Sequence, residues 1–218
     1  MRIAVFGGTG KAGWMLIQQA LDEGHEIVAF ARNPGKLTIR HDRLTIIAGE
    51  LSDETEIERA VGGTNAVVSL LGPLPASKGQ PITAGTKNVL AAMERHGVRR
   101  LVVVSTASAC DPNDVRDLKF ALLVGLMKRI YPAAYDDIVA TAAAVRASDR
   151  DWTIVRLPLL TNGPKTRVNA GHLGLGVVGT FLSRANLVEF LLRALQDPRT
   201  IRQAPAISNG RGNDGARK

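Results

Sequence analysis

The sequence predicts an α/β fold, a doubly wound parallel β-sheet with helices on both faces, built as one domain. Short β-branched runs alternate with longer segments of helical period, in the order typical of a parallel sheet. Most runs are continuously apolar, as expected for strands covered on both faces. The 218 residues, 45% hydrophobic and 22% charged, suit one globular core and are too few for two full-sized domains. The expected strands are residues 2–6, 26–30, 44–48, 66–70, 101–105 and 152–156.

Four segments between or after these strands have apolar residues at helical spacing. The first helix should end at Gly24, since glycine commonly follows a helix end, and the second near Gly97. Ser183 is a candidate N-cap for the last helix. The apolar stripes of the four expected helices lie within residues 13–21, 86–93, 138–145 and 187–195.

Two stretches interrupt the alternation. Residues 111–135 include an apolar helix over 118–127 that Pro132 ends, and residues 161–180 are rich in glycine and polar side chains. Both follow the carboxyl ends of strands, where open α/β sheets bind their ligands, so we expect them to cover a substrate site. The sequence thus predicts one domain over residues 1–208 with these two insertions, and a flexible tail over 209–218.

Glycines 7, 10 and 13 follow the first strand in the order GGTGKAG. A glycine-rich loop alone is weak evidence, but here it follows an apolar strand and opens an amphipathic helix, as a Rossmann-like dinucleotide site requires. Gly7 allows the sharp turn, Gly10 lets the backbone approach a pyrophosphate, and Gly13 lets the helix pack on the sheet. The free N–H groups of the helix start would bind the phosphates.

The end of the second strand indicates which nicotinamide cofactor binds. An NAD site expects Asp or Glu there to accept hydrogen bonds from the ribose hydroxyls, whereas this chain has Arg32 and no acid in reach. Arg32 can bind a 2′-phosphate with two N–H groups, and Lys11 can add a second positive charge. We therefore expect NADP(H) rather than NAD(H), with an ordinary solvated surface role for Arg32 as the alternative.

Seven motifs together resemble the atypical, or extended-loop, short-chain dehydrogenase/reductase superfamily. Within it, they are most similar to the NAD(P)H-binding branch of NmrA-like proteins and flavin or biliverdin-IXβ reductases. The resemblance covers nearly the whole chain. The motifs are GGTGKAG at 7–13, ARNP at 31–34, GELSD at 49–53, SLLGP at 69–73, VST at 104–106, DWTIVR at 151–156 and SRAN at 183–186.

The resemblance implies a role for each matching position. Glu50, where the family commonly has Asp, and Leu51 would border the adenine, and Leu70, Leu71 and Gly72 would follow the ribose and pyrophosphate. Ser105 and Thr106 match a hydroxyl pair near the nicotinamide, and Pro158 lies in the segment that would cover its carboxamide side. Leu157 departs from the pattern, because it separates Arg156 from that proline. The implied cofactor-binding residues are Gly7, Thr9, Gly10, Lys11, Ala12, Arg32, Glu50, Leu51, Leu70, Leu71, Gly72, Ser105, Thr106 and Pro158.

Acid catalysis is the larger departure from the superfamily. Typical members place Tyr and Lys four residues apart on a helix, so that the ammonium lowers the pKa of the phenol. Here Tyr131 is followed at that spacing by Tyr135, and Tyr135 by Val139. A hydride could still pass to an acceptor that needs little help with protonation, such as a flavin, a quinone or a conjugated tetrapyrrole. Ser105, Thr106 and Tyr135 are then the candidate catalytic residues.

The resemblance therefore implies an NADPH-dependent oxidoreductase acting on a planar small molecule. The alternative is a regulator of the NmrA type that binds NADP(H), does no chemistry and signals to a protein partner. The missing Tyr/Lys pair favours this alternative.

Composition bears on partners and compartment. The net charge of +8 favours anionic ligands, but the basic residues are scattered and aromatics make up only 4%, so we expect no specific nucleic-acid site. No His/Cys/Asp cluster has metal-ligand spacing. With no signal peptide, no membrane-spanning segment and one cysteine, Cys110, we expect a cytoplasmic monomer or homodimer without a membrane partner.

Overall fold

A computed structural model of the chain describes residues 1–72 and 79–210. Its main sheet has the strand order β3-β2-β1-β4-β5-β6-β10-β8, parallel except for β8, which runs antiparallel to β10. The predicted doubly wound α/β fold is confirmed. The strands are β1 (Arg2–Phe6), β2 (Glu26–Ala31), β3 (Leu44–Ala48), β4 (Ala66–Ser69), β5 (Arg100–Thr106), β6 (Asp151–Leu157), β8 (Val168–Gly171) and β10 (Ala206–Asn209), with β7 (Leu159–Thr161) and β9 (Phe181–Ser183) forming a separate pair.

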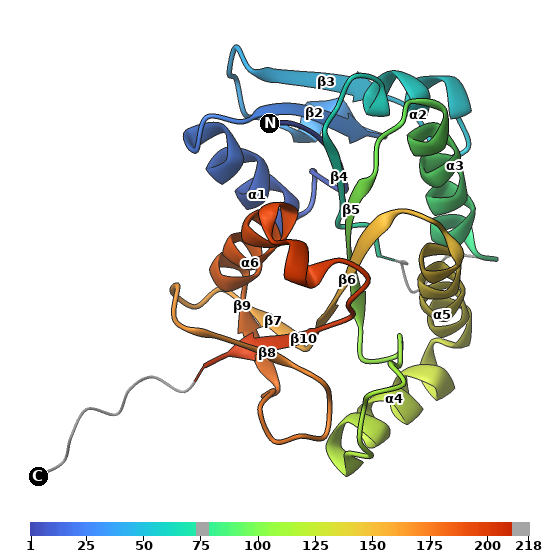
Figure 1. Cartoon of the computed structure of the whole chain (residues 1–218), viewed down its shortest axis with the longest axis vertical. Coiled ribbons are helices and arrows are strands. Elements are labelled where there is room, and N and C mark those ends of the chain that lie inside the picture. Colours follow the sequence, from blue (N-terminus) through green and yellow to red (C-terminus); the bar gives the residue numbers. More distant parts are fainter. Residues whose placement is uncertain (73–78, 211–218) are drawn as a thin grey trace, which may run out of the picture.

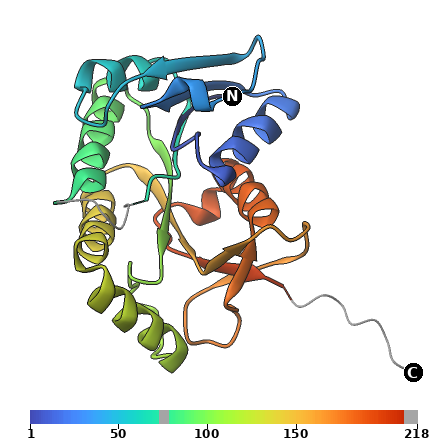
Figure 2. The same cartoon turned by 180° about the vertical axis from the view of Figure 1, so that it is seen from behind.

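Helices cover both faces of the sheet (Figures 1 and 2). Alternate residues of β1 point to opposite faces: Ile3 and Val5 pack in one core cluster with α1 and α6, and Ala4 and Phe6 pack in another with α2, α3 and α5. Residues Ile3–Phe6 of β1 and Ile27–Ala31 of β2 are therefore apolar at every position. The helices are α1 (Lys11–Asp22), α2 (Glu54–Val61), α3 (Pro81–Arg95), α4 (Leu118–Ile130), α5 (Pro132–Ala147) and α6 (Arg184–Gln196), with 3-10 turns at Pro34–Lys36 and Pro198–Thr200.

The predicted helix ends have clear causes. Gly24 has φ +88°, a conformation that favours glycine, and follows the end of α1 by two residues. The Ser183 hydroxyl accepts a hydrogen bond from the Asn186 N–H at 3.2 Å, so Ser183 caps α6. Pro132 ends α4 and also opens α5, because proline at the first helical position loses no helical hydrogen bond.

Several short elements were not predicted. Helix α2 has only eight residues, and β7 and β9 have three each, so none carries much periodic signal. Within residues 161–180, expected as an irregular insertion, β8 adds an edge strand to the main sheet. Asn209, expected in the tail, lies in β10 and accepts hydrogen bonds from Ser183 and Asn186. Residues 211–218 of the expected tail, and Pro73 of the 69–73 motif, lie outside the described residues.

Candidate functional site

The glycine loop connects β1 to α1, and packing explains two of the three glycines, Gly7, Gly10 and Gly13, that the dinucleotide motif requires. Gly7 has φ +86°, and a Cβ there would lie 2.8 Å from the carbonyl carbon of Leu70. At Gly13 a Cβ would lie 2.3 Å from the carbonyl oxygen of Gly7. Both positions exclude a side chain because the loop folds tightly against β4 and α1.

Gly10 is different, because the protein leaves room beside it. A Cβ at Gly10 would meet nothing closer than the Gly7 carbonyl oxygen at 3.6 Å, and Gly10 is exposed with φ −77°. It is the N-cap of α1 with no side-chain cap, and the first turn of α1 contains no acidic residue. This helix start therefore presents N–H groups and a positive dipole end to open space, as a bound phosphate needs.

Two cations flank the loop. Arg32 directly follows β2 and Lys11 is the first residue of α1, and both are exposed. Neither forms an ion pair within residues 1–72 and 79–210. Because β2 lies beside β1 in the sheet, the tip that carries Arg32 is next to the glycine loop.

Five further positions of the expected cofactor site, Glu50, Leu51, Leu70, Leu71 and Gly72, follow the carboxyl ends of β3 and β4. Glu50 is exposed, whereas Leu51 is half-buried, and its carbonyl accepts a hydrogen bond from Asn88 Nδ2 at 2.9 Å. A Cβ at Gly72 would meet nothing within 4 Å, so this glycine also borders open space. Thr9 is exposed, and Ala12, Leu70 and Leu71 are half-buried against the two core clusters. The loop, its cations and these neighbours fit a dinucleotide.

An apolar cavity of about 270 Å³ lies between α4 and the carboxyl ends of β5 and β6. Thr106, the last residue of β5, lines the cavity. Pro158 also lines it and directly follows β6, whose last residue is Leu157. Helix α4, which lies within the first predicted insertion, supplies much of the remaining wall. The lining residues are Thr106, Ala107, Ser108, Phe120, Leu123, Val124, Leu126, Met127, Ile130, Tyr131, Leu157, Pro158 and Leu159.

The three candidate catalytic residues lie in different surroundings. Thr106 lines the cavity, and its Oγ1 accepts a hydrogen bond from the Ser108 N–H at 3.2 Å. Ser105 precedes it in β5 and is not among the lining residues. Tyr135, in the first turn of α5, is also not among them, and Lys128 Nζ lies 5.4 Å from the centre of its ring. Tyr131, four residues earlier in the chain, is the tyrosine that lines the cavity. In the sequence, only its position directly before Pro132 could have indicated this.

A buried ion pair stabilises the loops beside the cavity. The Arg156 side chain, with no exposed surface, donates from Nη2 to Asp114 at 2.8 Å and from Nε to the Ala204 carbonyl at 2.7 Å. The N–H groups of Asp111 and Leu173 also donate to the Asp114 carboxylate, each at 2.9 Å. Burial alone would raise the pKa of Asp114, but these hydrogen bonds outweigh it and hold the pKa below its ordinary value. Asp114 thus joins both predicted insertions to β6.

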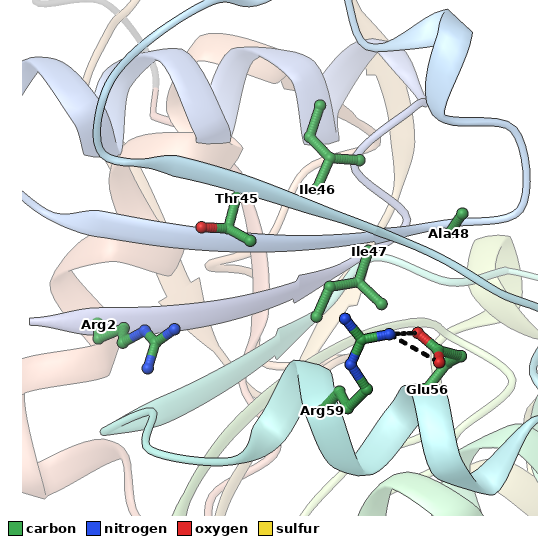
Figure 3. A pocket seen from close by; sticks show the side chains of 7 residues that line it. All are labelled: Arg2, Thr45, Ile46, Ile47, Ala48, Glu56 and Arg59. Carbon is green, nitrogen blue, oxygen red and sulfur yellow. Dashed lines mark hydrogen bonds and ion pairs between the residues drawn. The ribbon is translucent and has the colours of Figure 1, made fainter.

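A second hollow lies along the free edge of β3 (Figure 3). Arg59 and Glu56, three residues apart on α2, form an ion pair along one side of it, with Nη1 and Oε2 2.6 Å apart. Arg2, at the amino end of β1, lines its other side, so the hollow lies away from the glycine loop. Nothing in this hollow points to chemistry.

Comparison with known proteins identifies the family. A sequence model for proteins described as NAD(P)H-binding matches residues 7–198. The chain belongs to this NAD(P)H-binding family. This confirms the resemblance to atypical short-chain dehydrogenases/reductases that the seven motifs predicted.

Curated relatives include dehydrogenases and reductases that are longer than this chain, and also the photosystem II assembly factor Ycf39 from Synechocystis sp.. A 3-beta-hydroxysteroid dehydrogenase from Mycolicibacterium neoaurum is 30% identical over 119 residues, 49% of this chain and 32% of the relative. Cinnamoyl-CoA reductase 1 from Petunia hybrida is 28% identical over 215 residues, 86% of this chain and 63% of the relative. The chain therefore spans about a third of the length of the first relative and less than two thirds of the second.

Solved structures share the fold over nearly the whole chain. A wide-type short-chain dehydrogenase/reductase from Veillonella parvula, in complex with NADP, has a TM-score of 0.80 at 21% identity, covering 95% of this chain and 94% of its own. ChuY, an anaerobillin reductase from Escherichia coli O157:H7, has a TM-score of 0.78 at 18% identity and covers both chains completely.

The described residues contain neither a membrane-spanning helix nor a metal-binding cluster. Within residues 1–72 and 79–210, no helix combines the length and the apolar character needed to cross a bilayer. The same residues contain no group of three His, Cys, Asp or Glu side chains arranged to hold a metal ion.

Proposed function

We propose that this protein is an NADPH-dependent oxidoreductase that reduces a planar conjugated acceptor, such as a flavin or a quinone. The observation that carries the proposal is one shared edge of the sheet: β1 ends in the glycine loop, and β5 and β6 end in the apolar cavity. Thr106 and Pro158, the positions that the family resemblance assigns to the nicotinamide, line that cavity. Bound NADPH would supply the hydride, and the cavity would hold the acceptor beside it.

The chain's own residues favour NADPH over NADH. The exposed guanidinium of Arg32 would bind the 2′-phosphate, and the N–H groups at the start of α1 would bind the pyrophosphate beside Gly10. Lys11 would add positive charge to the same region. No acidic side chain stands in the 31–34 segment to accept hydrogen bonds from a free ribose 2′-hydroxyl.

Replacing Arg32 with alanine is expected to weaken NADPH binding by about 1 to 3 kcal/mol, the scale of a charge-assisted hydrogen bond, and to leave NADH binding nearly unchanged. Calorimetric titration of both cofactors measures this. Arg40→Ala, which removes an exposed arginine later in the same connection, is the matched control. An equal loss for both cofactors would show that Arg32 does not recognise the 2′-phosphate.

The cavity wall limits the acceptor. Its hydroxyl groups come from Thr106, Ser108 and Tyr131, and no lysine lines it. A carbonyl substrate needs an acid to protonate the developing alkoxide, whereas a flavin or quinone delocalises the added charge and can take its proton from water. An extended aromatic acceptor also suits the predominantly apolar wall.

Thr106→Val is expected to lower kcat/KM for the acceptor about tenfold and to leave the NADPH dissociation constant within about twofold, if the hydroxyl orients the acceptor. Thr106→Ser keeps the hydroxyl and should recover most of the activity. Steady-state kinetics with parallel cofactor titrations measures both. A parallel loss of stability in Thr106→Val alone would instead indicate that Thr106 only accepts the Ser108 N–H.

The test of the proposed function is NADPH oxidation, followed by absorbance under anaerobic conditions, with a panel of flavins, quinones and conjugated tetrapyrroles. Turnover with at least one planar acceptor is expected. Tight NADPH binding with no turnover would support the second candidate, an NADP(H)-sensing regulator, which the lack of a Tyr-x-x-x-Lys pair favours. Failure to bind either cofactor would contradict both.

We also propose that the protein acts on a small molecule in the cytoplasm, as a monomer or homodimer. Its one cysteine, Cys110, is exposed and has no intramolecular partner for a disulfide, which suits a reducing compartment.

A further inference from the structure

Helix α4 buries few of its apolar side chains. Phe120 is 7% exposed and Val124 and Met127 are half-buried, all facing the body of the protein. In contrast, Leu118 and Leu122 are 74% and 77% exposed. Exposed leucines in isolation are ordinary, but several on one short helix form a patch that a soluble surface usually avoids.

Four of the exposed apolar residues of α4 lie along one side, and the fifth, Leu123, lines the cavity. Leu118, Leu122, Leu126 and Ile130 follow one another at four-residue spacing, which places neighbours on the same side of a helix. Leu126 and Ile130 are 51% and 52% exposed. The helix therefore has an outward apolar side as well as the one that packs against the body, and Leu126 and Ile130 lie where the outward side meets the cavity.

Neighbouring loops extend this patch. Leu159 lines the cavity and pairs in register with Phe181, and the two are 52% and 55% exposed. Val115, 51% exposed, donates its N–H to Leu173, next to the turn that carries the exposed Leu175. Figures 1 and 2 both show α4 and the connection from β8 to β9 at the same end of the molecule. We call α4 with Val115, Leu159, Leu175 and Phe181 the apolar end.

Charge decides what could cover the apolar end. Residues 118–134 contain Lys119, Lys128 and Arg129 and no acidic residue. The nearest acid before them, Asp117, caps α4 by accepting from the Lys119 and Phe120 N–H groups. Two copies meeting through α4 would bring six cations together, which opposes self-association. An apolar helix side flanked by lysine and arginine instead matches an anionic lipid surface.

We propose that the apolar end docks on the surface of a membrane that contains anionic lipids. The leucines of α4 enter the boundary between headgroups and acyl chains, and Lys119, Lys128 and Arg129 bind lipid phosphates. This surface attachment departs from the expectation that no membrane is involved. The basic residues are scattered over the whole sequence, and the sequence does not show which side of residues 118–130 faces outward, which the fold supplies.

The cavity gives this docking a consequence, which rests on the proposed function. The lining residues Leu126, Ile130 and Leu159 are each more than half exposed, so they form the mouth of the cavity and also belong to the apolar end. A docked molecule would open its cavity toward the lipid. The acceptor is then a lipid-soluble molecule, in the quinone class rather than the flavin class.

The docking is tested by sedimentation with vesicles of phosphatidylcholine alone and with about a third phosphatidylglycerol, without cofactor. The full chain should bind the anionic vesicles and not the neutral ones. Leu118→Gln with Leu122→Gln should lower the partition coefficient about tenfold or more. Lys119→Glu with Arg129→Glu should lower it roughly 25-fold or more, at about fivefold per cation removed.

Matched controls separate docking from general charge attraction. Val139→Gln removes an exposed apolar residue from α5, and Lys87→Glu with Arg40→Glu makes the same charge change away from α4. Both should retain most of the binding. Loss equal to that of the α4 variants, or no binding to anionic vesicles, would overturn the docking. So would a stable dimer in gel filtration that Leu118→Gln with Leu122→Gln dissociates.

The acceptor class is tested separately, by NADPH oxidation with a long-chain quinone in anionic vesicles and with a short-chain soluble quinone. Faster turnover of the long-chain quinone, lost in the α4 variants, supports a lipid-soluble acceptor. Faster turnover of the soluble quinone overturns that acceptor class. No turnover with any acceptor contradicts the proposed function and leaves the vesicle result standing.

Discussion

Replacing Gly10 with leucine is expected to abolish binding of NADPH and NADH alike and to leave the fold intact. The structure separates these two effects, because a side chain at Gly10 has room on the protein side, with its nearest contact at 3.6 Å, and projects toward open space. That space is where a pyrophosphate must approach the N–H groups of α1. We expect affinity for both cofactors to fall about 100-fold or more, roughly 3 kcal/mol, in calorimetric titration.

Two other glycines serve as controls for this variant. Gly125→Leu places the same side chain on the outer side of α4, where a Cβ meets nothing within 4 Å, and should leave cofactor binding unchanged. Gly13→Leu should reduce stability as well as binding, because its Cβ would lie 2.3 Å from a backbone oxygen. A folded Gly10→Leu protein that binds NADPH normally would falsify the assignment of the loop.

Asp114→Asn is expected to cost about 3 to 5 kcal/mol of unfolding free energy, the usual effect of leaving a buried charge unpaired. The amide cannot neutralise Arg156, whose side chain has no exposed surface, and it cannot accept all four N–H groups that the carboxylate accepts. Urea unfolding measures the change. Asp136→Asn, at an exposed aspartate on α5, should stay within about 0.5 kcal/mol of the wild type.

The same pair predicts a pH dependence. Since the pKa of Asp114 in the folded protein lies below its ordinary value, the carboxylate contributes its full stability above about pH 4 and loses it as the pH falls through the lower folded value. The gap in unfolding free energy between the wild type and Asp114→Asn should therefore be constant from pH 7 to about 5 and narrow in stronger acid. A gap that is unchanged below pH 3 would mean that the ion pair does not account for it.

Local signals in the sequence were sufficient to place the residues that are expected to bind the nucleotide along one edge of the sheet. The turn at Gly7, the helix start at Gly10 and the arginine after β2 each depend on a few adjacent residues, and the parallel order of β1, β2 and β4 then places them on one edge. The predicted cofactor residues Ser105, Thr106 and Pro158 fall at the ends of β5 and β6 for the same reason.

Contacts distant in sequence were beyond prediction. Arg156 stands within a predicted strand and motif, yet nothing near it identifies Asp114, 42 residues away, as its partner. Tyr131 reaches the cavity only because α4 ends and α5 begins at that residue. Strands β7 and β9 pair with each other through three residues each. Strands this short carry no periodic pattern from which they could have been predicted.

The place of β10 in the sheet affects how the chain folds during synthesis. Because β10 lies between β6 and β8, a nascent chain cannot complete the sheet until residue 209 has emerged from the ribosome. Until then β6 has a bare edge of unpaired N–H and C=O groups, which is a template for wrong pairing with other chains. Slow elongation through α6 would prolong that exposure, so recombinant yield should respond more to codon choice in this stretch than in the earlier strands.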